Sequence, residues 1–398
     1  MDKKYTTELS IEAVRSELCE RIIPFWSGLI DQDYGGFYGS VDNQLNIDRT
    51  AFKGCILNSR ILWFFSSAYM LLGNDELLVC ANHAYRFMRD FCIDREHGGV
   101  YWSVTYDGVP LDTTKHTYNQ AFAIYALSAY NRASGETEAL IEADRLYELI
   151  ESRCRDEGGY LEAFDIDWHP ASNDKLSENG IIADRTMNTL LHVIEAYTNL
   201  FDVGHEKRVA ERLKSAISTV ADKVYSQEKR RLEVFFDNDM NPLIDLHSYG
   251  HDIEAAWLID RACDYLGDAV LTARMKPICE SLEDNILTLA VTENGLLNEC
   301  DCGVVNRWRI WWGQAEGVLG FYNAWQKRPE REDFLYASRS IWRYICEHIV
   351  DKREGGEWFW AIDEDGRTDP GRGEVEQWKC PYHNGRMCME LLTRMATQ

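Results

Sequence analysis

The 398-residue sequence lacks the positive charge of a nucleic-acid-binding protein. It carries 42 Lys and Arg residues against 66 Asp and Glu residues, for a formal net charge of −24. Proteins that bind nucleic acid displace counterions with a basic surface, so this balance argues against nucleic acid as a partner and disfavours anionic membranes. Such a net charge is typical of acidic soluble proteins.

The sequence also lacks segments that direct a chain into or through a membrane. No run of 18 apolar residues occurs, and the N-terminal MDKKYTTELSIEAVRSEL has no apolar core of a signal peptide. The twelve cysteines are scattered, without CxxC pairs or the Cys/His spacing of a zinc site. We therefore expect a cytoplasmic protein with reduced cysteines and no membrane partner.

Nucleotide-binding and nucleophile motifs are absent as well. The sequence contains no phosphate-binding loop, no dinucleotide fingerprint and no nucleophile elbow. It has only eight prolines, and no low-complexity or Pro/Ser/Gly-rich stretch divides it. We expect one catalytic domain, residues 1–398, with a large core.

What the sequence does contain is a sixfold repeat. Glycine- and aromatic-rich stretches with turn residues recur every 60 to 73 residues, and a helix-like segment follows each one. A fixed period of this kind is typical of repeat architectures. The stretches begin at Gly35, Gly98, Gly158, Arg231, Gly295 and Gly355.

Apolar periodicity predicts two helices in each repeat. The first of each pair is the more apolar and aromatic, as expected of a helix packed on all sides, and the second is richer in charge. The pattern predicts an all-α fold, an (α/α)6 barrel (a toroid of twelve helices) with short β-hairpins at one rim. The expected helices are 9–30, 52–72, 74–92, 116–133, 136–153, 184–202, 206–225, 251–266, 268–289, 309–326, 331–350 and 383–396.

The inner helices are expected to begin with polar or aromatic side chains that their apolar pattern does not require. In a ring, these ends converge on one mouth, and a concentration of buried polar groups there indicates a site, because such groups cost free energy unless they are satisfied. His251 and Glu254 are spaced to share a helix face, as are Asn188 and His192. The candidates are Arg60, Tyr118, Asn188, His192, His251, Glu254, Trp257, Trp312, Glu316, Trp378 and His383.

Taken singly, these residues have ordinary structural explanations. His192 on an apolar helix fits a core histidine bonded to the backbone, Trp312 fits simple packing, and His251 with Glu254 fits a helix cap or ion pair. A metal site from His251, His192 and Glu254 is a further alternative, but the spacing is not that of an HExxH motif. The recurrence of polar groups in six repeats favours a common site.

The chain resembles the N-acylglucosamine 2-epimerase superfamily, most closely its cellobiose 2-epimerase branch, in the stretches NSRILWFFSSAY, TMNTLLHVIEAY, HSYGHDIEAAWL, RIWWGQAE and WKCPYHNGRM. The resemblance covers nearly the whole chain in order. It implies an (α/α)6 barrel that inverts C2 of a reducing-end sugar without a metal or nucleotide cofactor. The zipper-like segment of the N-acylglucosamine branch is not evident, which favours a disaccharide substrate.

The resemblance also implies roles for the candidate residues. The sugar ring opens, a base removes the C2 proton to give a cis-enediolate, the C2–C3 bond rotates, and a proton returns to the other face. His383 is expected to abstract the proton from the gluco sugar and His251 to return one, with the roles reversed for the manno sugar. Arg60 contacts the enediolate oxygens, Glu254 assists His251 and ring opening, and His192 is an auxiliary acid/base. The expected substrate-binding residues are Asn188, Tyr118, Trp312, Glu316, Trp378 and Trp257.

Several alternatives stay open at this point. A mannobiose 2-epimerase, an N-acylglucosamine 2-epimerase and an aldose–ketose isomerase share the same core motifs. A glycoside hydrolase on the same toroid would use Glu254 and Glu316 as its two carboxylates. A non-catalytic carbohydrate-binding protein is a third class. We expect a monomer whose partner is a small disaccharide.

Overall fold

A computed structural model describes residues 7–176 and 179–397 of the chain. In this part of the chain the structure is mostly helical, which confirms the predicted helical class. The helices lie where the apolar periodicity places them, to within about one turn at each end. The local pattern of apolar residues therefore determines the secondary structure along nearly the whole chain.

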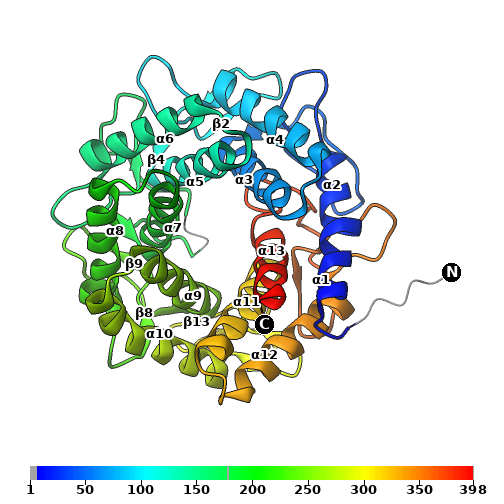
Figure 1. The fold of residues 1–398 in the computed structure, drawn as a ribbon, viewed down its shortest axis with the longest axis vertical. Helices are drawn as coiled ribbons and strands as arrows, with labels where there is room; N and C mark the ends of the chain where they lie inside the picture. The colour runs from blue at the N-terminus through cyan, green and yellow to red at the C-terminus, as the bar shows by residue number, and fades with distance from the viewer. Residues whose placement is uncertain (1–6, 177–178, 398) are drawn as a thin grey trace.

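Within the described residues, six helices form an inner ring in which each helix contacts the next (Figure 1). The last of them contacts the first, so the ring is closed. Each is continuous over four to five turns and buried along most of its length. The helices are α3 (Cys55–Leu72), α5 (Thr117–Ser134), α7 (Met187–Gly204), α9 (Tyr249–Leu266), α11 (Trp311–Lys327) and α13 (His383–Ala396).

A second layer of helices packs around this ring (Figure 1). Its members are α4 (Asp75–Phe87), α6 (Thr137–Leu149), α8 (Lys207–Thr219), α10 (Ala269–Leu289), α12 (Glu332–Tyr344) and, packed on α13, the N-terminal α1 (Ile11–Glu17), which continues into α2 (Ile23–Ser27). Most of them end in one π-helical turn: η1 (Leu18–Ile22), η2 (Met88–Cys92), η3 (Ile150–Cys154), η4 (Val220–Val224) and η5 (Ile345–Ile349). The repeat in the sequence is thus also a repeat of local backbone geometry.

The turn from an inner helix to its outer partner is short, and after α3, α5, α7 and α9 it begins with a left-handed residue, whereas α11 ends at Arg328 with φ of −133°. Gly73, Gly135 and Gly267 cap α3, α5 and α9 with φ of 66°, 75° and 61°. Glycine suits this position because it has no Cβ to clash in the left-handed region. At the end of α7 the same place is taken by His205, with φ of 50°. The tight turn sets each pair of helices antiparallel.

Short strands join neighbouring repeats at the N-terminal ends of the inner helices. The two- or three-residue strand before an inner helix pairs with the turn region of the following repeat, so the predicted hairpins are only part of the arrangement. These pairs are β1 (Lys53–Gly54) with β2 (Ser103–Val104), β4 (Lys115–His116) with β5 (Ala163–Phe164), β6 (Arg185–Thr186) with β9 (Phe235–Phe236), β10 (Leu246–Ser248) with β13 (Glu299–Asp301) and β15 (Arg309–Ile310) with β16 (Ala361–Ile362). Val41 and Val375 make the corresponding bridge between the first and last repeats.

Local hairpins complete the rim. They use β3 (Pro110–Asp112) with β2, β7 (Tyr225–Ser226) with β8 (Arg231–Leu232), β11 (Val291–Thr292) with β12 (Gly295–Leu296), and β14 (Val304–Asn306) with β13. Ion pairs at 2.6 to 2.7 Å hold several of the turns beneath them. Lys53 with Asp31, Lys115 with Asp94 and Lys379 with Glu357 are buried, whereas the buried Arg185 pairs with the exposed Asp156. A paired charge is the form in which a buried charge is tolerated.

Helix α3 has the length and mean hydropathy, 1.3, of a membrane span. However, 72% of this stretch is buried inside the protein, and it carries the buried Arg60. An apolar helix of this length is equally typical of the core of a large soluble fold. The packing of α3 against α4, α5 and α13 explains its composition.

Candidate active site

One cavity of about 190 Å³ lies at the N-terminal ends of the inner helices. Eight of the eleven candidate residues line it: Arg60, Tyr118, Asn188, His192, His251, Trp312, Trp378 and His383. They come from α3, α5, α7, α9, α11, α13 and the segment before α13. Residues from all six repeats therefore meet at one place, because each inner helix begins at the same rim of the ring.

The other three candidates do not line the cavity, which differs from the expectation that Glu316 and Trp257 bind substrate. Glu254, Trp257 and Glu316 are at most 1% exposed and lie beneath the cavity floor. The indole Nε1 of Trp257 donates to Glu316 Oε2 at 3.0 Å. Glu254 and Glu316 lie about one helical turn beyond the lining residues His251 and Trp312, and Trp257 lies deeper still, so these side chains contact the supporting layer.

His383 is held from below by a carboxylate. Its Nδ1 lies 2.7 Å from Glu316 Oε1 and 3.9 Å from Glu254 Oε1. The imidazole packs edge-on against Trp311 and lies against Trp312. With Nδ1 engaged, Nε2 is the ring nitrogen left for a substrate.

His251 has a different hydrogen-bonding partner. Its Nδ1 lies 2.7 Å from the hydroxyl oxygen of Ser248, and no carboxylate contact to its ring is present among the described residues. Its ring centroid lies 4.6 Å from that of Trp312, while the ring of His383 lies 5.5 Å from the same indole. The predicted assistance from Glu254 is therefore not through direct contact, because Glu254 faces Arg386.

The third histidine, His192, also rests on a carboxylate. Its Nδ1 lies 3.0 Å from Glu195 Oε2, which additionally accepts a short hydrogen bond from the Tyr382 hydroxyl. Glu195 and Tyr382 were not among the candidates. Glu195 follows His192 by three residues, as Glu254 follows His251 and Arg386 follows His383, so the spacing on one helix face could have revealed it.

Enclosure in the protein keeps these histidines neutral. Burial lowers the pKa of His251 to about 3, and the neighbouring His192 contributes in the same direction. Burial also lowers the pKa of His192, against the opposing influence of Glu195. For His383, burial followed by the charges of Arg386 and Arg60 holds the pKa well below its usual range. A neutral imidazole has a free lone pair, which is the form required of a base.

Arg60 places a positive charge on the cavity wall. Its Nη2 donates to the Tyr118 hydroxyl at 2.6 Å, and its guanidinium lies over the ring of Phe122, 4.1 Å from the centroid. It is 2% exposed, and among the described residues its guanidinium bonds to the Trp378 carbonyl, the Cys380 sulfur and the Tyr118 hydroxyl, without a carboxylate partner. A buried guanidinium without a counter-ion attracts a developing negative charge strongly.

Arg386 forms the centre of the layer beneath the histidines. Its Nη2 donates to Glu254 Oε1 at 2.5 Å and to Glu316 Oε1 at 2.8 Å, and its Nη1 makes short hydrogen bonds to Glu195 and Tyr382. Glu254, Glu316 and His383 lie close enough to hold a cation, but the guanidinium already bridges the two carboxylates. The alternative metal trio of His251, His192 and Glu254 is not brought together.

Aromatic rings form the walls above the histidines. Trp378, which is half-buried, lies 5.7 Å from Trp102 and 5.8 Å from Tyr118 between ring centroids. Trp312 is also half-buried, and Trp360, which was not among the candidates, belongs to the same lining. Large rings with exposed faces are suited to contact the apolar faces of sugars.

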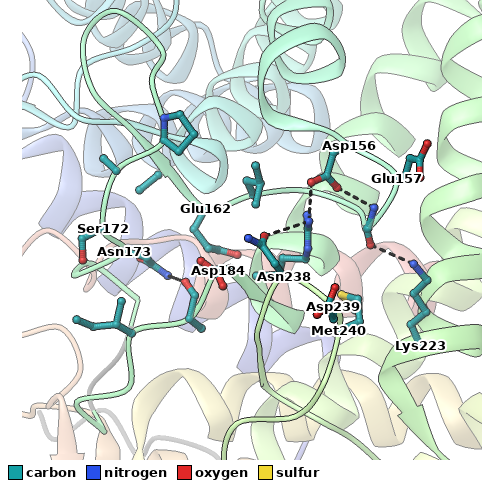
Figure 2. A pocket seen from close by; sticks show the side chains of 18 residues that line it. Asp156, Glu157, Glu162, Ser172, Asn173, Asp184, Lys223, Asn238, Asp239 and Met240 are labelled. Atoms are coloured by element: carbon teal, nitrogen blue, oxygen red, sulfur yellow. Dashed lines mark hydrogen bonds and ion pairs between the residues drawn. The ribbon is translucent and has the colours of Figure 1, made fainter.

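Two larger cavities lie elsewhere. One of about 660 Å³ is bordered by Asp156, Glu162 and Lys223 and contains none of the candidate residues among its lining (Figure 2). The other, of about 650 Å³, opens at the C-terminal ends of the inner helices, and Arg386 reaches its floor. The histidines and Arg60 distinguish the smaller cavity as the site of chemistry.

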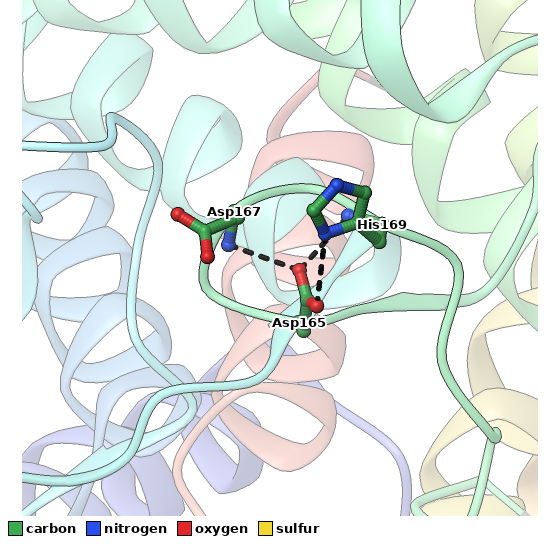
Figure 3. A group of neighbouring side chains, drawn as sticks. All are labelled: Asp165, Asp167 and His169. Carbon is green, nitrogen blue, oxygen red and sulfur yellow. Dashed lines mark hydrogen bonds and ion pairs between the residues drawn. The ribbon is translucent and has the colours of Figure 1, made fainter.

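An exposed acidic turn also brings together Asp165, Asp167 and His169 (Figure 3). Asp165 accepts hydrogen bonds from the backbone N–H groups of Asp167 and His169, at 3.0 and 2.9 Å. Similar turns at Asp237 and Asp363 make the same backbone bonds. The cluster is therefore explained as a repeated turn motif.

Comparison with known proteins agrees with this geometry. The model of the N-acylglucosamine 2-epimerase (GlcNAc 2-epimerase) family matches residues 36–384. The chain is 52% identical over 386 residues to a cellobiose 2-epimerase of Ruminococcus albus, covering 97% of this chain and 99% of that protein. It is 23% identical to the N-acylglucosamine 2-epimerase of Bos taurus, covering 95% of this chain and 91% of that protein.

A solved structure shows the same arrangement. The cellobiose 2-epimerase of Bacillus thermoamylovorans superimposes with a TM-score of 0.93 at 43% identity, covering 96% of this chain and 99% of that one. Both sequence and structure match over nearly the full length, so the likeness is not confined to one segment. The chain belongs to the N-acylglucosamine 2-epimerase family.

Proposed function

We propose that this protein is a cellobiose 2-epimerase, an isomerase that interconverts the gluco and manno configurations at C2 of the reducing-end sugar of β-1,4-linked disaccharides. The observation that carries the proposal is the placement of His251 and His383 in one cavity, where the rings of both lie against Trp312. Two neutral imidazoles facing the same carbon are what proton removal from one face and return to the other requires.

The chain's hydrogen bonds favour one division of labour between the histidines. A carboxylate only accepts hydrogen bonds, so Glu316 keeps a proton on Nδ1 of His383 and leaves Nε2 as a base. The Ser248 hydroxyl both donates and accepts, so His251 is free to carry its proton on Nε2 and act as the acid. In this scheme His383 removes the C2 proton of the gluco sugar and His251 supplies one to the opposite face.

Arg60 stabilises the intermediate. Proton removal from C2 beside the open-chain aldehyde places negative charge on the O1 and O2 oxygens of the cis-enediolate. The fixed guanidinium of Arg60 and the hydroxyl of Tyr118 provide positive charge and a donor on the cavity wall. Asn188 Oδ1, buried without a hydrogen-bond partner among the described residues, is available to accept from a sugar hydroxyl.

The aromatic walls and the comparisons support a disaccharide substrate. Trp312 and Trp378 offer ring faces for two sugar units, and the identity to the Ruminococcus albus cellobiose 2-epimerase is about twice that to the Bos taurus N-acylglucosamine 2-epimerase. A glycoside hydrolase using Glu254 and Glu316 is disfavoured, because both carboxylates are buried beneath the floor and bonded to one guanidinium.

The proposal extends to the whole molecule. The closed inner ring, the outer layer and the strands at one rim support an (α/α)6 barrel with short hairpins at that rim, acting as one catalytic domain over residues 1–398. We further propose a monomer that uses no cofactor, acts on a small disaccharide in the cytoplasm and binds neither nucleic acid nor membrane. The acidic net charge of −24 supports the last point.

The test is incubation with cellobiose in D₂O, followed by NMR of the reducing sugar. We expect glucosyl-mannose with deuterium at C2, because the proton passes through exchangeable histidines. Release of glucose would instead establish hydrolysis, and turnover only of mannobiose, N-acetylglucosamine or mannose would overturn the substrate. His251→Ala and His383→Ala should each lose roughly 10²–10⁴-fold in kcat. A loss below about tenfold would contradict the two-histidine mechanism.

A further inference from the structure

An unbroken chain of contacts links two cavity histidines through the protein interior. It runs from His192 to Glu195, then through Arg386 to Glu316 and His383. We infer that Glu195 and Arg386 are positioning residues, which fix the proton of both His192 and His383 on Nδ1 and so present both Nε2 lone pairs to the substrate.

Glu195 determines the state of His192. The charge of Arg386, with hydrogen bonds from His192 and Tyr382, outweighs burial and holds the pKa of Glu195 well below its usual range. An ionised carboxylate has no proton to donate, so the 3.0 Å contact to His192 Nδ1 requires a proton on that nitrogen. Oε1 of Glu195 is occupied by Arg386, which keeps the carboxylate from turning away.

Arg386 determines the state of His383 indirectly. Burial raises the pKa of both Glu254 and Glu316, and the charge of Glu316 raises that of Glu254 further. Glu316 accepts three N–H groups, from Arg386, Trp257 and His383, whereas Oε2 of Glu254 has no partner among the described residues. We therefore place the proton of the carboxyl pair on Glu254. Glu316 remains ionised, so His383 must donate from Nδ1.

The guanidinium is suited to this role because it only donates. Arg386 is fully buried and remains charged at any pH at which the protein is folded. Its two terminal nitrogens reach three carboxylates from α7, α9 and α11. A lysine would keep the charge but lacks the planar, fixed set of N–H donors that reaches these three carboxyl groups. His251, outside this chain of contacts, rests on a hydroxyl and is left free to exchange its proton.

Only the expected loss of kcat in variants rests on the proposed function; the tautomers of His192 and His383 can be measured without a substrate. The first test is ¹⁵N NMR of the resting protein, which distinguishes the two neutral tautomers of each histidine. Signals are assigned by their loss in His192→Asn and His383→Asn. We expect Nδ1–H for both residues. Nε2–H at either one overturns the inference, whatever the substrate is.

The second test uses variants of the two positioning residues. Glu195→Gln is isosteric and places an amide donor against Arg386 or against His192 and Tyr382. Arg386→Lys keeps the charge but removes the two terminal guanidinium nitrogens that bond to Glu195, Glu254 and Glu316. We expect a loss of kcat of about 10- to 100-fold with little change in KM, as is usual when groups that orient a reacting side chain are changed. The ¹⁵N signals of His192 should move in Glu195→Gln, and those of His383 in Arg386→Lys.

A matched control separates positioning from loss of stability. Glu283 is a buried carboxylate that accepts from Arg328 Nη2 at 2.7 Å, away from the cavity. Glu283→Gln should lower the melting temperature without changing kcat or the tautomers. If Arg386→Lys does not fold, the kinetics of Glu195→Gln and the histidine tautomers of the wild type still test the inference. A kcat loss with unchanged tautomers, or changed tautomers with unchanged kcat, overturns the inference.

Discussion

Nδ1 of His383 lies 2.7 Å from Oε1 of Glu316, although the two residues are 67 positions apart in the sequence. Glu316 is 1% exposed and does not line the cavity. A buried carboxylate behind an imidazole fixes its tautomer and stabilises the imidazolium that forms when it accepts a proton. Glu316, which lies beneath the cavity floor, therefore determines the reactivity of Nε2, the nitrogen of His383 that is left for a substrate.

This relationship predicts the effect of Glu316→Gln. The amide would place its NH2 group, which only donates, against the N–H of Trp257 or against those of Arg386 and His383, so at least one hydrogen bond must be lost. We expect kcat to fall about 100-fold with KM for cellobiose nearly unchanged, because the side chain does not contact the sugar. Steady-state kinetics measure this. A rise in KM with constant kcat would place Glu316 in the cavity wall instead.

Arg60→Lys should lower kcat because the enediolate loses its fixed planar donor. Loss of one such electrostatic contact costs roughly 10²–10³-fold in kcat. The lysine would also leave Tyr118 without its 2.6 Å donor. The control is Arg328→Lys, which removes a guanidinium packed 4.6 Å from the ring of Phe334 outside the cavity. We expect that control to change stability alone, and a similar kcat loss in both variants would refute the role of Arg60.

His116 should make the stability of the protein depend on pH. Burial lowers its pKa from 6.5 to about 4, against the opposing hydrogen bond to Asn173. As the pH falls, the unfolded state therefore takes up a proton before the folded state does. The contribution of neutral His116 to the free energy of unfolding is complete above pH 6.5 and is lost progressively as the pH falls to about 4.

The measurement compares the wild type with His116→Gln by denaturant unfolding at pH 7 and pH 5. The stability advantage of the wild type should shrink by about 2 kcal/mol between these two values, since each pH step below the unfolded pKa is worth about 1.4 kcal/mol. An unchanged difference for His116→Gln would mean that His116 is not buried in its neutral form.

The cap of α7 offers a stabilising substitution. His205 is exposed and adopts φ of 50°, whereas Gly73, Gly135 and Gly267 occupy the same position in other repeats. His205→Gly should raise the free energy of unfolding by up to about 1 kcal/mol, because glycine adopts this region without a Cβ clash. The reverse change, Gly267→Ala, has free space around it but should cost a similar amount. Melting temperatures test both: we expect a rise for His205→Gly and a fall for Gly267→Ala, and a change in the reverse direction for either variant would contradict the backbone argument.

The positions of the helices could be predicted from the sequence because they depend on local patterns. Apolar residues at helical spacing bury the helices, and Gly73, Gly135 and Gly267 end three of the inner helices because glycine adopts the left-handed region freely. The repeat then brings residues at matching positions to one rim. For that reason Arg60, His192, His251 and His383 could be recognised as candidates and lie in one cavity.

Only the tertiary structure decided which of the polar residues face the cavity and which support it. Glu254 and Glu316 follow the lining residues His251 and Trp312 by about one helical turn, and Trp257 lies deeper still. All three contact Arg386. Glu195, from a third helix, joins the same guanidinium. These contacts depend on the radius of the ring and on how its helices are rotated, which are set by packing among all six helices together and not by the residues of any one of them.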